Sequence, residues 1–398
     1  MMKLDPRHIL VVRRDSYPKE THVLRNVTTL LEAGFEVELI CLKEPDQPYI
    51  EHNDHLRIFR VPLEHRRGNL WRTFVEYWIF FFVLAFLVPL RFLVSKPKSI
   101  EIDTMPNFLV FSALLPRLLG ARVVLYMFEL IPETYCEKLK VGMSHPIVRM
   151  IRLEEKLSAM FASRIVVYHE LMAEALGKRG IDVRKMHVVY NVPLEDRYSV
   201  GVSAEPRETG KVYFIHHGLV AQHYGLQYLL QALKILEDQL KPCPPIQLDI
   251  VGKGEYIPQL EALAERLKFH TVQVVFWGYV PDEKLVALLR RADAGILPLL
   301  SNILSPNKLF DLAYFGKPVL CSRVDAITYH FPEDAILYFA KGDTADIAAK
   351  LQAFIIKKDE LSKSLSANIA KIYEKISWRY QKTLYLSIYA DERNPLNG

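Results

Sequence analysis

The pattern of apolar and polar positions in the first half of the chain predicts strands and helices that alternate. Short runs rich in β-branched residues are typical of buried strands, and apolar residues recurring every three or four positions predict helices. The first such helix is expected to end at Gly34. The expected strands are 9–12, 37–41, 58–61, 99–102, 122–126, 164–168 and 187–190, and the expected helices are 23–31, 106–119, 145–162 and 170–179. This order is typical of a doubly wound parallel sheet.

A second alternation follows a polar stretch, 193–210, which has little apolar periodicity and which we interpret as a linker. Its expected strands are 211–216, 246–251, 272–277, 294–298 and 318–322, and its expected helices are 225–239, 256–267, 282–291 and 306–315, with a helical end over 344–390. We therefore predict an α/β chain with two Rossmann-like, doubly wound domains, 1–192 and 211–372. Aromatic and charged residues alternate near the end, as on a docking helix, so 373–398 is expected to pack back on the first domain.

Size and charge narrow the class of function. The chain has 398 residues, half of them apolar, which is enough for two packed cores. Its net charge of +5 is too small to indicate a nucleic-acid partner. The four cysteines show no spacing typical of a disulfide framework or a zinc site, which favours a reducing, cytoplasmic location. The apolar run near the N-terminus is too short for a signal peptide and is expected to form the first strand.

One apolar segment, 77–90 (YWIFFFVLAFLVPL), carries no charged residue and lies between Glu76 and Arg91. A spanning helix needs about 20 apolar residues, so this segment is expected to be too short to cross a membrane. It is either a buried helix of the first domain or an interfacial helix in a bilayer surface. Nearby basic residues favour the second interpretation, peripheral contact with the inner surface of the cytoplasmic membrane, because they attract anionic lipid. They are Arg60, Arg66, Arg67, Arg72, Arg91, Lys96 and Lys98.

The stretch 305–322, SPNKLFDLAYFGKPVLCS, predicts a short helix with a ligand at its start. Ser305 is a good N-cap, and Pro306 is a good first helical residue. Lys308 in the first turn works against the helix dipole, which suggests an anionic ligand such as a phosphate. Asp311, one turn further on the same face, has the acceptors to bind two ribose hydroxyls. The alternative is an ordinary solvated pair of charges.

Other loops of the second half fall at the carboxyl ends of parallel strands, where open α/β sheets bind ligands. VGKGEY (251–256) places Gly-x-Gly between a strand and a helix, and its glycines either approach a ligand or only shape the turn. In VVFWGYVP (274–281), Gly278 would let the backbone approach a flat ligand. ADAGILPL (292–299) contains the strand that precedes the expected helix 306–315.

Taken in order, these motifs resemble the C-terminal half of the retaining glycosyltransferases of family 4, which have the GT-B fold. The resemblance over 211–322 is carried by the His217–Gly218 turn, VGKGEY, VVFWGYVP, ADAGILPL and NKLFDLAYFGKPVLCS. In the first half, YMFELIPE (126–133), 153–176 and HVVYNVP (187–193) resemble further family segments. The resemblance implies two domains facing a cleft. It also implies transfer of a sugar from a UDP- or GDP-sugar to a glycan or lipid-linked acceptor, in cell-surface polysaccharide or glycolipid synthesis. Retention at the anomeric carbon, with no metal or other cofactor, is implied as well.

The resemblance also implies roles for individual residues. Asp311 would hold the ribose hydroxyls, Lys308 would act as the catalytic cation at the diphosphate, and Glu129 would orient an acceptor hydroxyl or the donor sugar. The N–H groups of the turn from Gly218 onward would cover the phosphates, and the loop at Tyr279 would meet the base. The remaining donor-binding candidates are Leu219, Gln222, His223, Gly252, Val280, Ser305, Asn307, Arg14 and Lys19.

Three positions depart from the family's usual pattern. The acidic residue expected eight positions before the ribose carboxylate is Ile303, and Phe128 stands where a histidine is common. The turn GLVAQHYG (218–225) lacks the usual arginine and lysine, a loss of charge that weakens stabilisation of the leaving diphosphate. The groups expected to compensate are Gln222, His223, Lys308, Arg14 and Lys19.

Two other functions remain open. One is a nucleotide-sugar 2-epimerase on the same fold, and the other is a non-catalytic, membrane-associated binding protein, which the missing cations in 218–225 favour. The loop 13–22 is likewise either an anion site facing the cleft or an ordinary basic surface loop.

Overall fold

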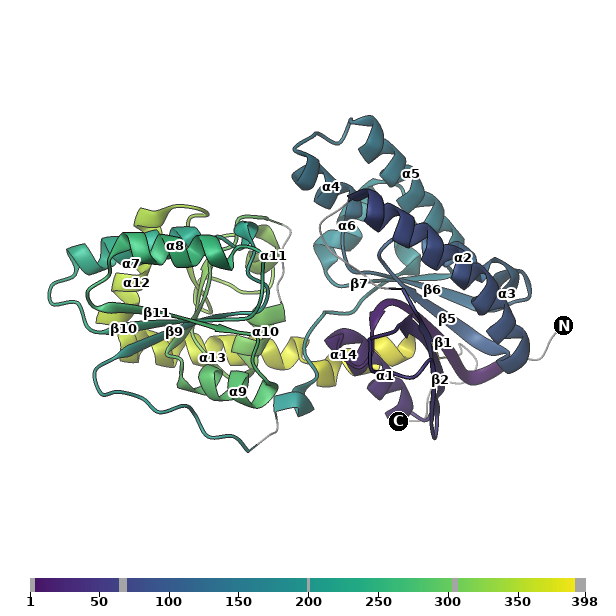
Figure 1. The fold of residues 1–398 in the computed structure, drawn as a ribbon, viewed down its shortest axis with the longest axis horizontal. Coiled ribbons are helices and arrows are strands. Elements are labelled where there is room, and N and C mark those ends of the chain that lie inside the picture. The colour runs from purple at the N-terminus through teal and green to yellow at the C-terminus, as the bar shows by residue number, and fades with distance from the viewer. Residues whose placement is uncertain (1–3, 64–69, 199–200, 303–306, 391–398) are drawn as a thin grey trace. The chain divides into compact units, whose positions relative to one another are not determined.

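The chain folds into two compact units, as Figure 1 shows in this computed structural model, which describes residues 4–63, 70–198, 201–302 and 307–390. Unit 1 comprises Met1–Asn191 together with Arg379–Gly398, and unit 2 comprises Val192–Trp378. Each is built on one predominantly parallel sheet. The predicted fold class, two Rossmann-like α/β domains, is therefore confirmed.

The sheet of unit 1 has eight strands, and the central ones are buried on both faces, as their continuous apolar runs predict. Only β3 pairs antiparallel to its neighbour, and the other described pairs are parallel. In order across the sheet the strands are β3 (Ile50–Asn53), β4 (Leu56–Val61), β2 (Glu36–Leu42), β1 (Asp5–Ser16), β5 (Pro97–Asp103), β6 (Arg122–Met127), β7 (Arg164–Val167) and β8 (Met186–Val188).

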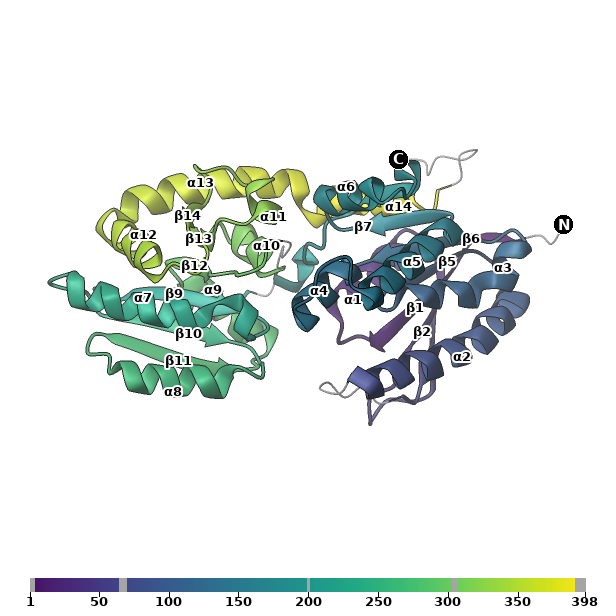
Figure 2. The ribbon, with the colours of Figure 1, turned by 90° about the horizontal axis from the view of Figure 1, so that it is seen from above.

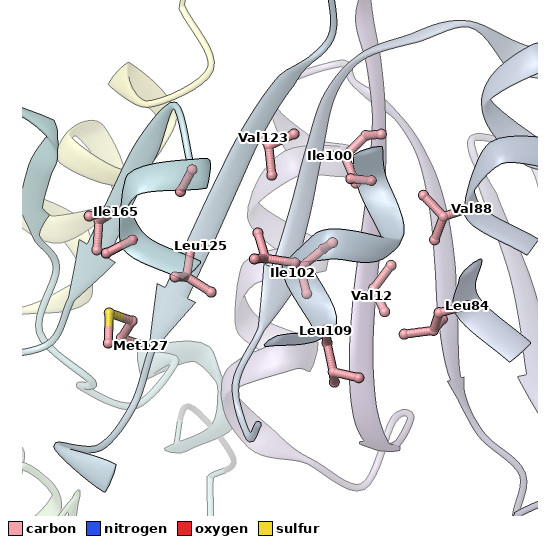
Figure 3. Packing of buried hydrophobic residues seen from close by; sticks show 14 of the residues in the cluster. Val12, Leu84, Val88, Ile100, Ile102, Leu109, Val123, Leu125, Met127 and Ile165 are labelled. Atoms are coloured by element: carbon pink, nitrogen blue, oxygen red, sulfur yellow. The ribbon is translucent and has the colours of Figure 1, made fainter. Parts of the chain in front are cut away.

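One face of this sheet shares an apolar core with several helices. Figure 3 shows Leu84 and Val88 of α2 and Leu109 of η1 facing Val12 and Ile102 of the strands. The helical segments that contribute to this core are α2 (Leu70–Ser95), the 3-10 helix η1 (Asn107–Ala113), α5 (Pro146–Phe161) and α6 (Glu170–Lys178). The other helical segments of residues 4–190 are α1 (Thr21–Glu32), α3 (Leu114–Leu118), α4 (Ile131–Leu139) and η2 (Val183–Lys185).

Helix α14 (Trp378–Ser387) returns the end of the chain to unit 1. The hydroxyls of Tyr385 and Tyr389 donate to the carboxylate of Glu101, which is fully buried in β5. Burial raises the pKa of Glu101 above its usual value. Arginines of β6 and β7 donate to carbonyl groups just beyond α14, where a helix has unsatisfied acceptors. Polar contacts therefore fix α14 against the sheet.

The sheet of unit 2 has six strands, all parallel. In order they are β11 (Val272–Gly278), β10 (Ile246–Val251), β9 (Val212–His217), β12 (Ala294–Leu297), β13 (Val319–Ser322) and β14 (Leu337–Phe339). The helices are α7 (Leu226–Gln239), α8 (Ile257–Leu267), α9 (Asp282–Arg291), α10 (Asn307–Tyr314), α11 (Asp325–Thr328), α12 (Thr344–Ile356) and α13 (Lys358–Ile376), with the 3-10 turns η3 (Glu195–Tyr198) and η4 (Gln222–Tyr224).

The polar stretch interpreted as a linker lies along unit 2 over its last residues. The amide of Glu205 donates to the carbonyl of Ala287, and its carboxylate lies 2.8 Å from the amine of Lys284. Arg207 donates to both carboxylate oxygens of Asp293. These contacts satisfy the polar groups of a segment that has too few apolar residues to build regular structure.

Several elements differ from those expected from the sequence. The expected helix 106–119 is two segments, η1 and α3, because Pro116 has no N–H to donate to Ser112 in a continuous α-helix. The short strands β3 and β14 and the helix α4 were not expected. Helix α2 runs far beyond 77–90, because Glu76 is buried in contact with arginines and Arg91 pairs with a glutamate, so neither charge ends the helix.

Candidate functional site

Three loops of unit 2 are joined backbone to backbone at the carboxyl ends of β9, β10 and β11. The amide of Gly218 donates to the carbonyl of Val251 at 2.8 Å, and the amide of Gly252 donates to that of Gly278 at 2.7 Å. The amide of Val220 donates to the carbonyl of Lys253 at 2.9 Å. These bonds make one continuous rim at the edge of the sheet where ligands bind in such folds.

The glycines of VGKGEY make this close approach possible. A Cβ atom on Gly252 would lie 1.9 Å from the carbonyl oxygen of Gly218, and one on Gly254 would lie 1.7 Å from that of Val220. Gly252 also has a φ of +136°, which side-chain-bearing residues rarely adopt. Both glycines are therefore required by the neighbouring turn, which is the simpler of the two interpretations of this motif.

Replacing Gly254 by Ala should lower the free energy of unfolding by about 3 kcal/mol or more, because the new methyl overlaps a backbone oxygen and the two loops must separate. Urea unfolding of the purified protein measures this. Gly278→Ala is the matched control: its Cβ meets no atom within 4 Å, and a φ of +63° costs only about 1 kcal/mol. Equal losses in the two variants would contradict the proposed packing.

Helix α10 turns its two charged residues into unit 2, beneath this rim. Lys308 is 5% exposed and Asp311 is 8% exposed, so the interpretation of a solvated pair is wrong. The amine of Lys308 lies 2.9 Å from Nε2 of His216 and 3.8 Å from the centre of the Tyr224 ring. A Cβ on Gly218 would lie 3.7 Å from the same nitrogen. The cation therefore sits directly beside the backbone of the turn that lacks cations of its own.

Asp311 is held by two donors, Tyr198 of η3 and His217 at the end of β9. The hydroxyl of Tyr198 donates to one carboxylate oxygen at 2.6 Å, and Nε2 of His217 lies 2.8 Å from the other. Each carboxylate oxygen has a second lone pair, so these bonds leave acceptor capacity for a ligand hydroxyl. The bonds also fix the orientation of the carboxylate before any ligand arrives.

Burial changes the protonation of this cluster. Burial lowers the pKa of Lys308 to about 7, and the nearby Asp311 opposes that shift. Burial and the Lys308 cation lower the pKa of His216, which is therefore neutral at physiological pH. Its Nδ1 lies 2.9 Å from the carbonyl of Ile296 and carries the proton, so Nε2 accepts from Lys308. Near pH 7 the lysine is poised between its charged and neutral forms.

Other predicted donor-binding residues line the surface around the rim. Tyr279 is 71% exposed, and the amine of Lys253 lies 5.0 Å from the centre of its ring. Leu219, Gln222, His223 and Asn307 are exposed and Val280 is half-buried. Ser305 and Ile303 lie outside the described residues.

Comparison with known families identifies the chain. A family model described as "Glycosyl transferases group 1" matches residues 211–356, and one described as "Glycosyl transferase 4-like domain" matches residues 20–192. The chain belongs to the group 1 glycosyltransferases of family 4. One family model matches most of unit 1 and the other matches most of unit 2, so membership of the family holds for both units.

Individual relatives of this group 1 glycosyltransferase are distant. Chitobiosyldiphosphodolichol beta-mannosyltransferase of Candida albicans is 24% identical over 246 residues, 56% of this chain and 52% of that protein. The chain thus spans about half the length of the curated relative it matches. Sucrose-phosphate synthase of Thermosynechococcus elongatus has a TM-score of 0.74 at 15% identity, covering 96% of this chain and 98% of its own. HepE of Anabaena in complex with UDP-glucose has a TM-score of 0.65 at 14% identity, with the same coverage. These structural matches confirm the GT-B fold.

In unit 1, the structure places the remaining predicted residues of this glycosyltransferase at the carboxyl ends of strands. Arg14 stacks its guanidinium 4.4 Å from the centre of the Tyr77 ring and donates to the carbonyl of Met105, and burial lowers its pKa. Lys19 is exposed and pairs with Glu44. Glu129 is exposed just after β6, where its carboxylate accepts from the hydroxyl of Thr134 at 3.3 Å. Their roles toward a ligand stay predictions.

The side chains that hold Lys308 and Asp311 in this glycosyltransferase were not predicted from the sequence. His216 and His217 end β9, and two adjacent histidines at the carboxyl end of a strand were the available signal. Tyr198 lies within the stretch interpreted as a linker, and Tyr224 lies in the turn without cations. No local pattern connects either tyrosine to α10.

Proposed function

We propose that this glycosyltransferase is a retaining enzyme that takes a hexose from a UDP- or GDP-sugar. The observation that carries the proposal is the buried Lys308 amine beside Gly218, at the carboxyl ends of the strands of unit 2. Because this amine is shielded from water, its electrostatic attraction to a neighbouring diphosphate is strong. The amine of Lys308 lies over the ring of Tyr224 in the 218–225 turn. This position supports the proposal that Lys308 of α10 takes the place of the cations that this turn lacks.

In the proposed reaction, the bond between the sugar C1 and a diphosphate oxygen breaks, and its electron pair stays on that oxygen. Protonated Lys308 stabilises the charge that develops there, since a fixed cation in a water-poor site needs no reorganisation during the step. The acceptor hydroxyl forms the new bond at C1 and gives its proton to the departing diphosphate oxygen. Among the described residues, the amides of Leu219 and Ala221 have no partner, whereas Gly218 and Val220 donate to the neighbouring loop. We therefore assign phosphate contacts from the turn to Leu219 and Ala221.

Asp311 is proposed to bind the ribose hydroxyls with its remaining lone pairs, in the orientation set by Tyr198 and His217. Tyr279 is proposed to meet the base, since an exposed aromatic ring stacks on a flat ligand regardless of its exact identity. Unit 1 is proposed to hold the acceptor, with Glu129 orienting its hydroxyl. A lipid-linked acceptor at a membrane surface is supported by the Candida relative, whose name gives a diphosphodolichol-linked substrate.

Titration calorimetry with UDP, GDP, UDP-glucose and GDP-mannose tests this proposal. One nucleotide series should bind with a dissociation constant between about 1 µM and 1 mM, as sugar-nucleotide enzymes bind their donors. The matching sugar nucleotide with a lipid-linked acceptor should then yield a glycosylated acceptor that retains the anomeric configuration. No binding to any of the four would support a non-catalytic protein instead. Release of a free epimerised sugar without acceptor would support the 2-epimerase.

A further inference from the structure

Helix α2 has an outer side that is apolar along nearly its whole length. A helix at a protein surface normally turns charged or polar residues outward. The side of α2 away from the sheet instead exposes Trp71, Phe74, Val75, Trp78, Ile79, Phe82, Phe86, Leu90, Leu93 and Val94. Phe86 alone is 69% exposed. An uninterrupted apolar stripe of this kind is typical of a surface that is covered by a membrane or by a partner protein.

The inner side of α2 shows that the helix does not leave unit 1. Phe80, Leu84, Val88 and Phe92 follow one another at four-residue steps and are fully buried in the core of the sheet. By length and composition, Trp71–Ser95 could cross a membrane, with a mean hydropathy of 2.2. The buried row fixes the helix parallel to the sheet surface, so its outer side is available to a bilayer only as a helix lying in the interface.

Helices α3 and α5 lie on the same face of the sheet as α2, as Figure 2 shows in the view from above, and their exposed apolar residues extend the apolar surface. Aromatic contacts link them through η1: Trp78 of α2 stacks on Phe108 at 5.0 Å, and Phe111 meets Phe161 of α5 at 5.2 Å. The exposed apolar residues that they add are Leu114, Leu115 and Leu118 of α3 and Ile147, Met150, Leu153, Leu157 and Met160 of α5.

The charges on these helices are segregated by sign. The acids of α5 point inward: Glu155 is buried and accepts from Arg179, and Glu154 accepts from Asn107. Burial raises the pKa of Glu154 to about 7, so this carboxyl group is only partly ionised near neutral pH. Arg149, Arg152 and Lys156 are exposed on α5 at helical spacing, and none pairs with a described acid. Over the described residues of α2, α3 and α5, the exposed charges are therefore all basic.

We propose that the outer sides of α2, α3 and α5 form a docking surface for the anionic lipid headgroups and acyl chains of one membrane leaflet. A broad apolar surface bordered by unpaired cations matches the two attractions that hold interfacial helices, burial of apolar area and attraction to anionic lipid. The helix α2, about 39 Å long at 1.5 Å per residue, would lie in the plane of the interface. The cations of this proposal are those of α5, because Arg60, Arg72 and Arg91 are paired with glutamates and Arg66 and Arg67 lie outside the described residues.

The inference rests on the proposed function only for its purpose, which is to bring the acceptor site of unit 1 to a lipid-linked substrate. Vesicle binding is measured without any sugar nucleotide. A failure to bind lipid would leave the donor site untouched, and a failure to bind nucleotides would leave the docking surface untouched.

Flotation of the full-length protein with lipid vesicles tests the surface. The protein should float with vesicles of phosphatidylcholine and phosphatidylglycerol, and weakly or not at all with phosphatidylcholine alone. Arg149→Gln with Lys156→Gln should lower the partition coefficient by about 30-fold, since two cations near anionic lipid contribute about 2 kcal/mol. Phe82→Ser with Phe86→Ser should lower it by at least as much.

Matched substitutions elsewhere in the chain distinguish binding through this surface from nonspecific binding to vesicles. Lys363→Gln with Lys371→Gln removes two exposed lysines of α13, and Ile356→Ser removes an apolar residue of α12 that is 64% exposed. Neither change should alter flotation. Equal losses in these controls, or flotation of wild type unaffected by the α2 and α5 changes, would overturn the proposal.

Fluorescence distinguishes insertion from a protein partner. Trp71 and Trp78 lie on the surface, so brominated acyl chains should quench the tryptophan emission, and Trp71→Phe with Trp78→Phe should remove most of that quenching. The circular dichroism spectra of all variants should match that of wild type. A dimer in solution that dissociates on Phe82→Ser with Phe86→Ser, without vesicle binding, would identify a second copy of the chain as the occupant and refute the lipid surface.

Discussion

Replacing Lys308 by Met is expected to make the protein more stable and to abolish its binding of sugar nucleotides. A lysine whose pKa falls from 10.5 to about 7 costs the folded state about 4 kcal/mol at pH 7. Loss of the hydrogen bond to His216 offsets part of this gain. The free energy of unfolding should therefore rise by about 2 kcal/mol at pH 7. Chemical denaturation measures this, and calorimetry measures binding.

The pH dependence gives this prediction a distinct sign. Between pH 7 and 10.5 the unfolded state binds the proton of Lys308 more tightly than the folded state, so wild-type stability rises with pH across that window. From pH 7 to pH 9, wild type should gain about 2 kcal/mol relative to Lys308→Met, and the gap between them should close. Lys317→Met is the matched control, because the amine of Lys317 donates to the carbonyl groups of Arg290 and Ala292 at the end of α9, so its loss should lower stability. A variant at position 308 that is less stable than wild type at pH 7 would contradict the account of the buried amine.

Replacing Asp311 by Ala is expected to weaken nucleotide binding by about 100-fold and to destabilise unit 2. Two hydrogen bonds from ribose hydroxyls to a carboxylate contribute about 3 kcal/mol to binding together, which corresponds to a change of about 100-fold in affinity. Tyr198 and His217 lose their acceptor at the same time, and each is buried. The free energy of unfolding should fall by about 2 to 4 kcal/mol. Binding of a free sugar should change far less than binding of a nucleotide.

Asp293 provides a control of the same kind. Its side chain is 12% exposed, as is that of Asp311, and it too accepts hydrogen bonds from two groups, the guanidinium of Arg207 and the amide of Tyr213. It stands at the amino end of β12, at the opposite edge of the sheet. Asp293→Ala should lose comparable stability and keep wild-type nucleotide affinity. Unchanged affinity in Asp311→Ala as well would remove Asp311 from the binding site.

The arrangement of strands and helices could be predicted well from the sequence where apolar runs were long and regular. The helix 282–291 has the bounds expected, and most sheet strands differ from their expected bounds by one or two residues. Short elements failed because three or four residues, as in β14, carry too little periodicity to be recognised. Helix α2 was underestimated because charges that are paired in the structure read as helix boundaries in the sequence.

The site was predictable only in part. Local helix signals indicated that Lys308 and Asp311 belong to one short helix, and that helix is present. The sequence did not indicate that both side chains turn inward, because their partners come from β9, from η3 and from the 218–225 turn. Contacts between residues that lie about a hundred positions apart follow from the packing of the whole unit, which no short motif encodes.

The return of α14 to unit 1 has a consequence for synthesis on the ribosome. The sheet of unit 1 has emerged once residue 188 has been translated, yet Glu101 still lacks the hydroxyls of Tyr385 and Tyr389. In a nascent chain that ends before these tyrosines, the carboxyl group of Glu101 lacks its hydrogen-bond donors. A buried polar group without partners costs folding free energy. Unit 1, although its strands are translated first, therefore completes its contacts only when the last described residues of the chain have been made.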